Sequence, residues 1–154
     1  MFRALSCNNK TLKHLDLSGV CCRGTSAEAM EHALRDNSTL EKLTLDRVNL
    51  SKAASVSLAR GLAKNTRLSL LSLRRGDYCY RTLAKALKIN RTLQRLYADG
   101  VNNSSFGSLA QAIKVNTSLC FVELDGGGTV GLRSFVDAVK YNTTLQEFAA
   151  FSFK

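Results

Sequence analysis

The chain has 154 residues, of which 45% are hydrophobic and 22% charged, and its formal net charge is +10. This composition excludes a disordered polypeptide, and no apolar run approaches the roughly 18 to 20 residues needed to cross a bilayer. Residues 1–6 are too short and too mixed for a secretory signal, and the five cysteines show no C-x-x-C spacing. We therefore expect a cytoplasmic protein with reduced thiols, and neither a disulfide framework nor a zinc site.

One short phrase recurs along the chain. In each copy an asparagine is followed three residues later by a leucine, which opens an L-x-x-L-x-L pattern such as Leu12, Leu15 and Leu17. The spacing between copies is 25 to 28 residues, and the asparagines are Asn9, Asn37, Asn65, Asn90, Asn116 and Asn142. The last two apolar positions of each copy alternate with polar ones, which predicts a β-strand in each unit.

A helix is predicted after each strand, because apolar residues then follow at helical spacing. The ranges with this spacing are 51–64, 80–89, 104–115 and 135–139. Ser51 and Ser104 are expected N-caps, and Thr25 with Glu28 fits a capping box. Each helix is expected to end at the repeat asparagine, a residue that tolerates the left-handed backbone of many C-terminal turns.

These units predict an α/β fold, a leucine-rich-repeat solenoid of about five to six repeats. A curved parallel sheet is expected on the inner face and helices on the outer face, joined by right-handed crossovers. Residues 1–154 are expected to form a single domain. Neither end has the polar cap that a solenoid needs, so the chain is interpreted as a fragment of a longer array, a short divergent relative of one, or a chain that covers its ends by self-association.

The phrase N-x-T-L-x-x-L-x-L, followed by a helix ending in A-L-K-x-N, resembles the ribonuclease-inhibitor-type leucine-rich repeats. Residues 67–90 and 92–116 carry the closest match. The same repeat type forms the C-terminal arm of NOD-like receptors of innate immunity. The resemblance implies a ligand-sensing or regulatory arm that binds a protein on its concave strand face.

One position departs from that family. Three residues after the third apolar position of each unit, the family usually carries an asparagine or cysteine that bonds the loop backbone. Here that position holds Val20, Val48, Gly76, Val101, Gly127 and Phe153. The usual ladder of polar side chains is therefore not expected at these loops.

The outward positions of the strands predict a binding face. Its middle is basic, the stretch that follows is acidic, and two aromatic residues lie between them. The candidate partner-binding residues are Arg74, Arg75, Arg95, Tyr97, Asp99, Phe121, Glu123 and Asp125. Exposed aromatic groups beside an arginine have the composition of an interface hot spot, so Arg95, Tyr97 and Phe121 are the predicted anchors.

The positive charge is concentrated in residues 60–95, where ten basic residues are opposed by Asp77 alone. Such a patch attracts nucleic acid, anionic lipid or acidic protein. The repeat offers a simpler explanation for Lys64 and Lys88, because cations in the last turn complement the helix dipole. Nucleic acid is therefore kept only as an alternative partner of this region. The N-x-S/T triplets at Asn37, Asn90, Asn116 and Asn142 also leave a glycoprotein open.

No arrangement typical of catalysis is present. His14 and His32 have no metal-binding spacing, Cys21-Cys22 lies in a loop, and residues 126–128 lack the lysine of a phosphate-binding loop. We expect no enzyme activity, no cofactor and no metal. The alternative function is a GTPase-activating protein of the Ran type, which has this repeat but also an acidic C-terminal stretch that this chain lacks.

Overall fold

The computed structural model describes residues 9–20, 27–76 and 78–151. Six parallel strands form one sheet, in which each strand lies beside the next strand of the sequence. The strands are β1 (His14–Asp16), β2 (Lys42–Thr44), β3 (Leu70–Leu73), β4 (Arg95–Val101), β5 (Phe121–Gly126) and β6 (Glu147–Phe151). The α/β fold with a parallel sheet, predicted from the repeats, is confirmed.

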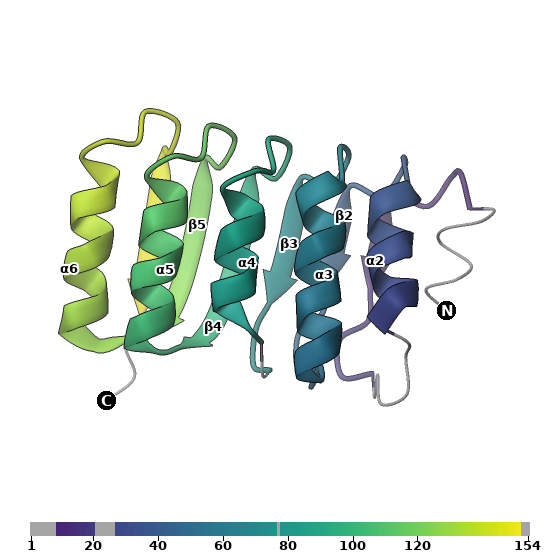
Figure 1. The fold of residues 1–154 in the computed structure, drawn as a ribbon, viewed down its shortest axis with the longest axis horizontal. Helices are drawn as coiled ribbons and strands as arrows, with labels where there is room; N and C mark the ends of the chain where they lie inside the picture. The colour runs from purple at the N-terminus through teal and green to yellow at the C-terminus, as the bar shows by residue number, and fades with distance from the viewer. Residues whose placement is uncertain (1–8, 21–26, 77, 152–154) are drawn as a thin grey trace.

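The described helices lie side by side on one face of the sheet, in the order of the chain (Figure 1). They are α2 (Ala27–Asp36), α3 (Lys52–Lys64), α4 (Tyr80–Leu87), α5 (Asn103–Ile113) and α6 (Gly128–Val139). The opposite face of the sheet carries no described helix. Side chains that alternate along a strand therefore enter either the core or an open face.

The repeat leucines form the core between sheet and helices. Leu43 pairs in register with Leu71, and Leu71 with Leu96, so that equivalent leucines stack from strand to strand. Each of these three side chains is 0% exposed. Burial of one leucine stabilises the fold by about 1.5–3 kcal/mol, so a continuous column of them holds consecutive units together.

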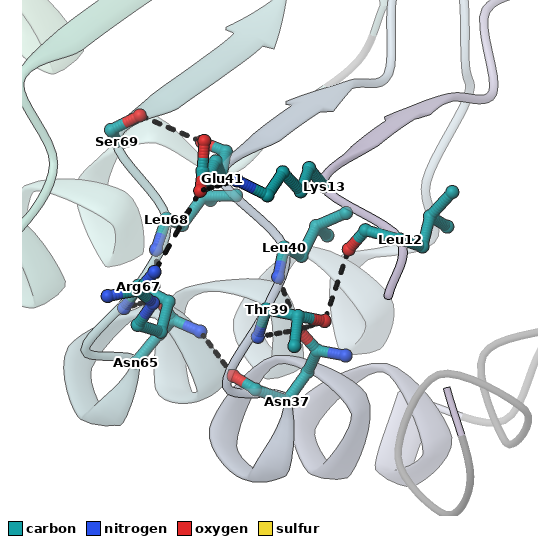
Figure 2. Close-up of polar contacts among 10 residues, drawn as sticks. All are labelled: Leu12, Lys13, Asn37, Thr39, Leu40, Glu41, Asn65, Arg67, Leu68 and Ser69. Carbon is teal, nitrogen blue, oxygen red and sulfur yellow. Dashed lines mark hydrogen bonds and ion pairs between the residues drawn. The ribbon is translucent and has the colours of Figure 1, made fainter. Parts of the chain in front are cut away.

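The repeat asparagines form a second column at the turns that lead from each helix to the next strand. The side-chain oxygen of Asn65 accepts hydrogen bonds from the backbone N–H groups of Arg67 at 2.9 Å and Leu68 at 2.6 Å. Its side-chain nitrogen donates to the carbonyl of Leu34, in the preceding unit, at 2.6 Å. It also approaches the carbonyl of Asn37, in that same preceding unit, at 3.5 Å (Figure 2). One amide thus closes its own turn and ties it to its neighbour.

The same bonding recurs at Asn90, Asn116 and Asn142, each of which donates to two carbonyls of the unit before it. We call this column the asparagine ladder. The expected left-handed backbone is wrong: Asn65 has φ −71° and ψ 137°, an extended conformation that aims the amide at both partners. Of the four asparagines named for the glycoprotein alternative, Asn37, Asn90 and Asn116 are buried at 5%, 2% and 2% exposure, so the folded chain does not offer these amides for modification, whereas Asn142 is half-buried.

Two of the loops that lead from strand to helix are closed by apolar side chains instead. Val48 and Val101 stand where the ribonuclease-inhibitor-type repeats usually carry an asparagine or cysteine. Their side chains are 0% and 1% exposed. Burial in the core replaces the polar ladder that the family has there. Residues 126–128 join β5 to α6 with a positive φ at each glycine, as expected of a connecting loop.

Two of the expected helix starts can be compared with the structure. Ser51 caps α3 as predicted, since its side chain accepts a hydrogen bond from the backbone N–H of Ala54 at 3.2 Å. The cap of α5 is Asn102 rather than the predicted Ser104, whose hydroxyl donates to the Asn102 side chain at 3.0 Å. The capping box predicted at Thr25 lies outside the described residues, as do residues 1–6, Cys21-Cys22 and Phe153, for which the sequence also raised expectations.

Candidate protein-binding surface

The open face of the sheet carries an aromatic cluster, formed by Arg95, Tyr97 and Phe121. The rings of Tyr97 and Phe121 lie 5.0 Å apart between centroids, and the Arg95 guanidinium lies 5.9 Å from the Phe121 centroid. Arg95 pairs in register with Phe121 on the neighbouring strand, which brings the three side chains together as the sequence predicted. Both rings are half-buried, so part of each remains accessible to solvent.

Arg74 connects this cluster to the acidic residues. It directly follows β3, and its guanidinium lies 4.7 Å from the centroid of the Tyr97 ring on β4. The same guanidinium forms an ion pair with Glu123 on β5. Basic and acidic residues that the sequence places on separate strands are therefore paired in part, and the face is less polarised than their order along the chain suggested.

A groove runs along the C-terminal ends of the strands, with a volume of about 530 Å³. Five of the eight predicted site residues line it: Arg74, Arg75, Asp99, Glu123 and Asp125. Arg95, Tyr97 and Phe121 are absent from its lining and lie further back along the sheet. The predicted site is thus two adjacent features, an aromatic cluster and a charged groove.

Burial raises the pKa of Asp99 above its ordinary value, and the nearby charge of Asp125 raises it further. The charge of Arg74 and a hydrogen bond from the backbone of Arg75 oppose this shift. Negative charge is therefore crowded at the β4–β5 end of the groove. A cationic group of a bound partner would relieve that repulsion.

The predicted site residues left out part of the groove lining, namely Ser18, Gly19, Asp46, Arg47 and Phe151, although Ser18, Asp46 and Phe151 occupy outward positions that the strand pattern indicates. Asp46 also builds the groove, because its carboxylate accepts hydrogen bonds from the Ser72 hydroxyl at 2.6 Å and the Arg74 backbone N–H at 2.9 Å. A signal was present in the sequence. These residues follow their core leucines at the same offsets as Arg74 and Arg75, and equivalent loops meet at one edge of a parallel sheet.

Seven of the ten basic residues of the 60–95 region separate into two groups, and Arg95 belongs to the aromatic cluster. Arg74 and Arg75 belong to the groove, whereas Arg60, Lys64, Arg81, Lys85 and Lys88 belong to α3, α4 and the residue after α4. The second group lies on the helix side, away from the open face. The predicted basic patch is therefore not continuous with the predicted protein-binding face.

The outer face of α6 is apolar and exposed. Leu132, Val136 and Val139 are 40%, 52% and 38% exposed. The residues at the same repeat positions of α5 are Phe106, Ala110 and Ile113, and α6 packs beside that helix (Figure 1). These equivalents are 1% or less exposed, so α6 presents a face that is buried elsewhere in the fold.

Within the described residues, no group of three or more His, Cys, Asp or Glu side chains is placed to hold a metal ion. His14 and His32 are both exposed, as expected of surface residues. Cys79 and Cys120 are free thiols. In the same part of the chain, no helix has the length and apolar character needed to cross a membrane.

The fold defines a class of protein, an α/β chain of strand–helix repeats in which one face of the sheet carries none of the described helices (Figure 1). No protein-family model and no curated protein matches the sequence. Similar folds occur among solved structures. One is titled "Leiomodin-1 Actin-Binding Site 2", with a TM-score of 0.72 and 15% identity over 92% of this chain and 86% of that chain. Another is the tropomodulin C-terminal domain of Caenorhabditis elegans, with a TM-score of 0.65 and 17% identity over 92% of this chain and 90% of that one.

These structures correct the family expected from the sequence. The similar folds are leiomodin and tropomodulin domains, so the assignment to ribonuclease-inhibitor-type repeats of a NOD-like receptor is wrong. The innate immune role and the alternative of a Ran-type GTPase activator are corrected with it. The asparagine ladder supplies the physical reason. The asparagine of the N-x-T-L phrase closes the turn and binds the unit before it. The phrase therefore reports a backbone arrangement, and repeat families with different functions can share it.

Proposed function

We propose that the chain is a leucine-rich-repeat solenoid, a single repeat domain that binds a protein partner and catalyses no reaction. One strand and one helix per unit, stacked in register with their leucines in one column, support the repeat assignment. The observation that carries the binding role is the helix-free face, where the aromatic cluster adjoins the charged groove. The proposed location is the cytoplasm, where Cys79 and Cys120 would stay reduced.

The partner that we propose is actin. The support is the likeness in fold to a domain titled as an actin-binding site, over 92% of this chain. The surface suits a large protein partner, because half-buried aromatic rings beside an arginine offer much contact area at little entropic cost. The groove adds charged groups of both signs, which fix the orientation of a docked protein.

The test is binding of the purified chain to actin, by fluorescence anisotropy with monomers and by co-sedimentation with filaments. Substitution of both Tyr97 and Phe121 by alanine is expected to weaken binding at least about tenfold, or about 1.4 kcal/mol. The matched control is Tyr141→Ala, which removes an aromatic ring that is 65% exposed and lies away from the sheet face. This control is expected to change affinity less than about twofold.

Two results would overturn the proposal. Absence of binding to monomers and filaments up to about 100 µM actin would reject actin as the partner. Binding that survives the Tyr97 and Phe121 substitutions but falls in the Tyr141→Ala control would move the interface away from the open face. Circular dichroism of each variant separates loss of binding from loss of fold.

We also propose that the apolar face of α6 mediates self-association. Leu132 and Val136 are exposed at positions whose counterparts in α5 are buried, and this supports a helix-sized occupant. Sedimentation velocity is expected to detect dimers that Val136→Asp converts to monomers. A concentration-independent monomer mass for the unsubstituted chain would contradict this proposal without affecting the binding of actin.

A further inference from the structure

The helix side carries a second surface, a groove between α3 and α4. Val56, Ala59 and Ala63 of α3 line it from one side, and Ala86 of α4 with Ile89 from the other. Its volume is about 300 Å³. Ile89 is 64% exposed, so a large apolar side chain stands uncovered at its edge. We call this feature the α3–α4 groove.

Cations surround this groove. Arg60 of α3 and Lys85 of α4 are part of its lining, and both are exposed. Lys64, Arg81 and Lys88 are exposed on the same two helices or at the residue after them. Neither α3 nor α4 contains an aspartate or glutamate. In the described part of the chain, the ion pair found for these five cations is Arg60 with Glu31 at 3.9 Å, where Arg60 is 67% exposed.

The repeat does not account for the cations that flank the groove. Lys64 and Lys88 recur as Lys114 and Lys140 at the ends of α5 and α6, where they complement the helix dipole. Arg60 and Lys85 also occupy equivalent positions, five residues before Asn65 and Asn90. At that position the next two units have Gln111 and Asp137, so the positive charge belongs to α3 and α4 alone.

We propose that the α3–α4 groove binds an acidic amphipathic segment of a partner protein. An apolar side chain of the segment would fill the groove against Ile89, and carboxylates beside it would pair with Arg60 and Lys85. The arrangement combines an apolar pocket with a charged rim, which is the composition of a peptide-binding groove. This surface lies on the opposite side of the sheet from the proposed actin-binding face, so the inference does not depend on actin binding.

Two other anionic partners fit the surface less well. Single-stranded nucleic acid needs exposed aromatic rings for stacking, and the aromatic residue of α3 and α4 is Tyr80, which is only 3% exposed. A membrane surface needs several apolar groups that project outward, whereas here Ile89 is the one exposed large apolar side chain of the groove, and Ala59 and Ala86 are buried at its base. A peptide can insert one side chain into the groove and keep its charges at the rim.

The test uses a fluorescein-labelled synthetic peptide of about 16 residues, with leucine at every third or fourth position and glutamate elsewhere. Binding is followed by fluorescence anisotropy with the full chain in about 150 mM salt, which screens weak non-specific attraction. A scrambled peptide of the same composition, with no apolar face, is the peptide control. Ile89→Ser removes the apolar edge of the groove, and the double variant Arg60→Glu with Lys85→Glu reverses its charge.

The double variant is expected to weaken binding at least about tenfold, and Ile89→Ser about threefold to tenfold. The matched control is Lys114→Glu with Lys140→Glu, which makes the same change in net charge at the residues that follow α5 and α6. It is expected to weaken binding less than about threefold. Circular dichroism checks the fold of each variant. Unchanged actin binding by the Arg60 and Lys85 double variant would show that the α3–α4 groove and the proposed actin-binding face act independently.

Several outcomes would overturn the proposal. One is no binding of the amphipathic peptide up to about 100 µM, and another is equal binding of the scrambled peptide. Equal losses in the double variant and its control would mean that only net charge matters. Tighter binding to phosphatidylserine-containing vesicles or to a single-stranded oligonucleotide, with the same sensitivity to Arg60, Lys85 and Ile89, would assign the surface to lipid or to nucleic acid.

Discussion

Arg74 and Glu123 form an ion pair that spans the whole width of one strand. Arg74 follows β3 and Glu123 belongs to β5, so the guanidinium crosses β4 and lies over the Tyr97 ring on its way. The pair therefore joins three units of the repeat on the open face. It also connects the aromatic cluster to an acidic residue of the groove.

The first prediction concerns the strength of this pair. The Arg74 and Glu123 side chains are 36% and 21% exposed, so solvent screens their attraction and the coupling should be about 1 kcal/mol or less. A double-mutant cycle with Arg74→Met and Glu123→Gln, followed by urea unfolding, measures this coupling. In about 1 M salt the coupling is expected to shrink further. Strict additivity of the two substitutions at low salt would contradict the pair.

The second prediction concerns the asparagine ladder. Asn90→Ala removes the bonds to the carbonyls of Leu62 and Asn65 and leaves two backbone N–H groups in the turn without their acceptor. Asn90 is 2% exposed, so the lost bonds are not replaced by water and the free energy of unfolding should fall by about 3 kcal/mol or more. The measurement is urea unfolding at neutral pH.

The control for the ladder is Asn142→Ala. Asn142 makes the same kinds of bond but is only half-buried, near the last strand, so water can replace part of what is lost. Its cost is expected to be smaller than that of Asn90→Ala by about 1 kcal/mol or more. Equal decreases in the free energy of unfolding for Asn90→Ala and Asn142→Ala would mean that burial does not strengthen the hydrogen bonds of the asparagine ladder.

The sequence predicted the order and pairing of the strands because one physical requirement dictates both. Each leucine must enter the core, and a slip of one residue would turn it outward, so the alternation fixes the register that joins Leu43 to Leu71. The meeting of Tyr97 with Phe121 followed from that register. The crossing of β4 by Arg74 did not follow, because a long side chain can adopt many rotamers and the sequence does not select among them.

The charged groove was only partly predictable. Asp99 and Asp125 could be placed on one edge from the strand pattern, whereas Arg47 was left out although it follows Leu45 at the same offset as Arg75 follows Leu73. The family was assigned wrongly for the opposite reason. The asparagine phrase is a strong signal, but it reports the turn geometry that Asn65 closes, which unrelated functions can share.

The third prediction follows from the raised pKa of Asp99. A carboxyl whose pKa is raised in the folded state stabilises the fold below its ordinary value of 3.8, and this contribution is lost as pH rises through the folded pKa. At neutral pH the ionised Asp99 therefore costs stability, chiefly through burial and repulsion by Asp125. Asp99→Asn keeps the size and an acceptor for the Arg75 backbone, so the variant should unfold at a higher urea concentration at pH 7.

The pH dependence is the check on this sign. The gain in free energy of unfolding that Asp99→Asn produces should shrink as pH is lowered from 7 toward 4. The reason is that the Asp99 carboxyl of the unsubstituted chain then takes up a proton and loses its charge. Asp16 is the control with the opposite sign, since hydrogen bonds from Ser18 lower its pKa and its contribution is lost as pH falls. Asp16→Asn should therefore destabilise the chain at pH 7. An advantage of Asp99→Asn that does not vary with pH would reject the electrostatic cause.

The last prediction concerns the backbone strain at the groove. Arg75 has φ 55°, and the equivalent positions of two other units are glycines, Gly19 with φ 71° and Gly100 with φ 67°. This conformation costs a residue with a side chain about 1–2 kcal/mol of folding free energy. Glycine avoids that strain, but it lowers stability by about 0.5–1 kcal/mol because its unfolded chain has more conformational entropy. Arg75→Gly should therefore stabilise the chain by roughly 0.5–1 kcal/mol in urea unfolding.

Arg75→Ala separates this strain from the loss of the charged side chain. Alanine keeps the Cβ, so this variant should gain no stability, although it removes the same guanidinium from the groove. If Arg75 contacts the partner, both variants should weaken actin binding by similar factors, while only Arg75→Gly becomes more stable. Strained backbone then persists at the groove because the side chain that it presents contributes to binding. Destabilisation of equal size in both variants would show that the positive φ is not the source of strain.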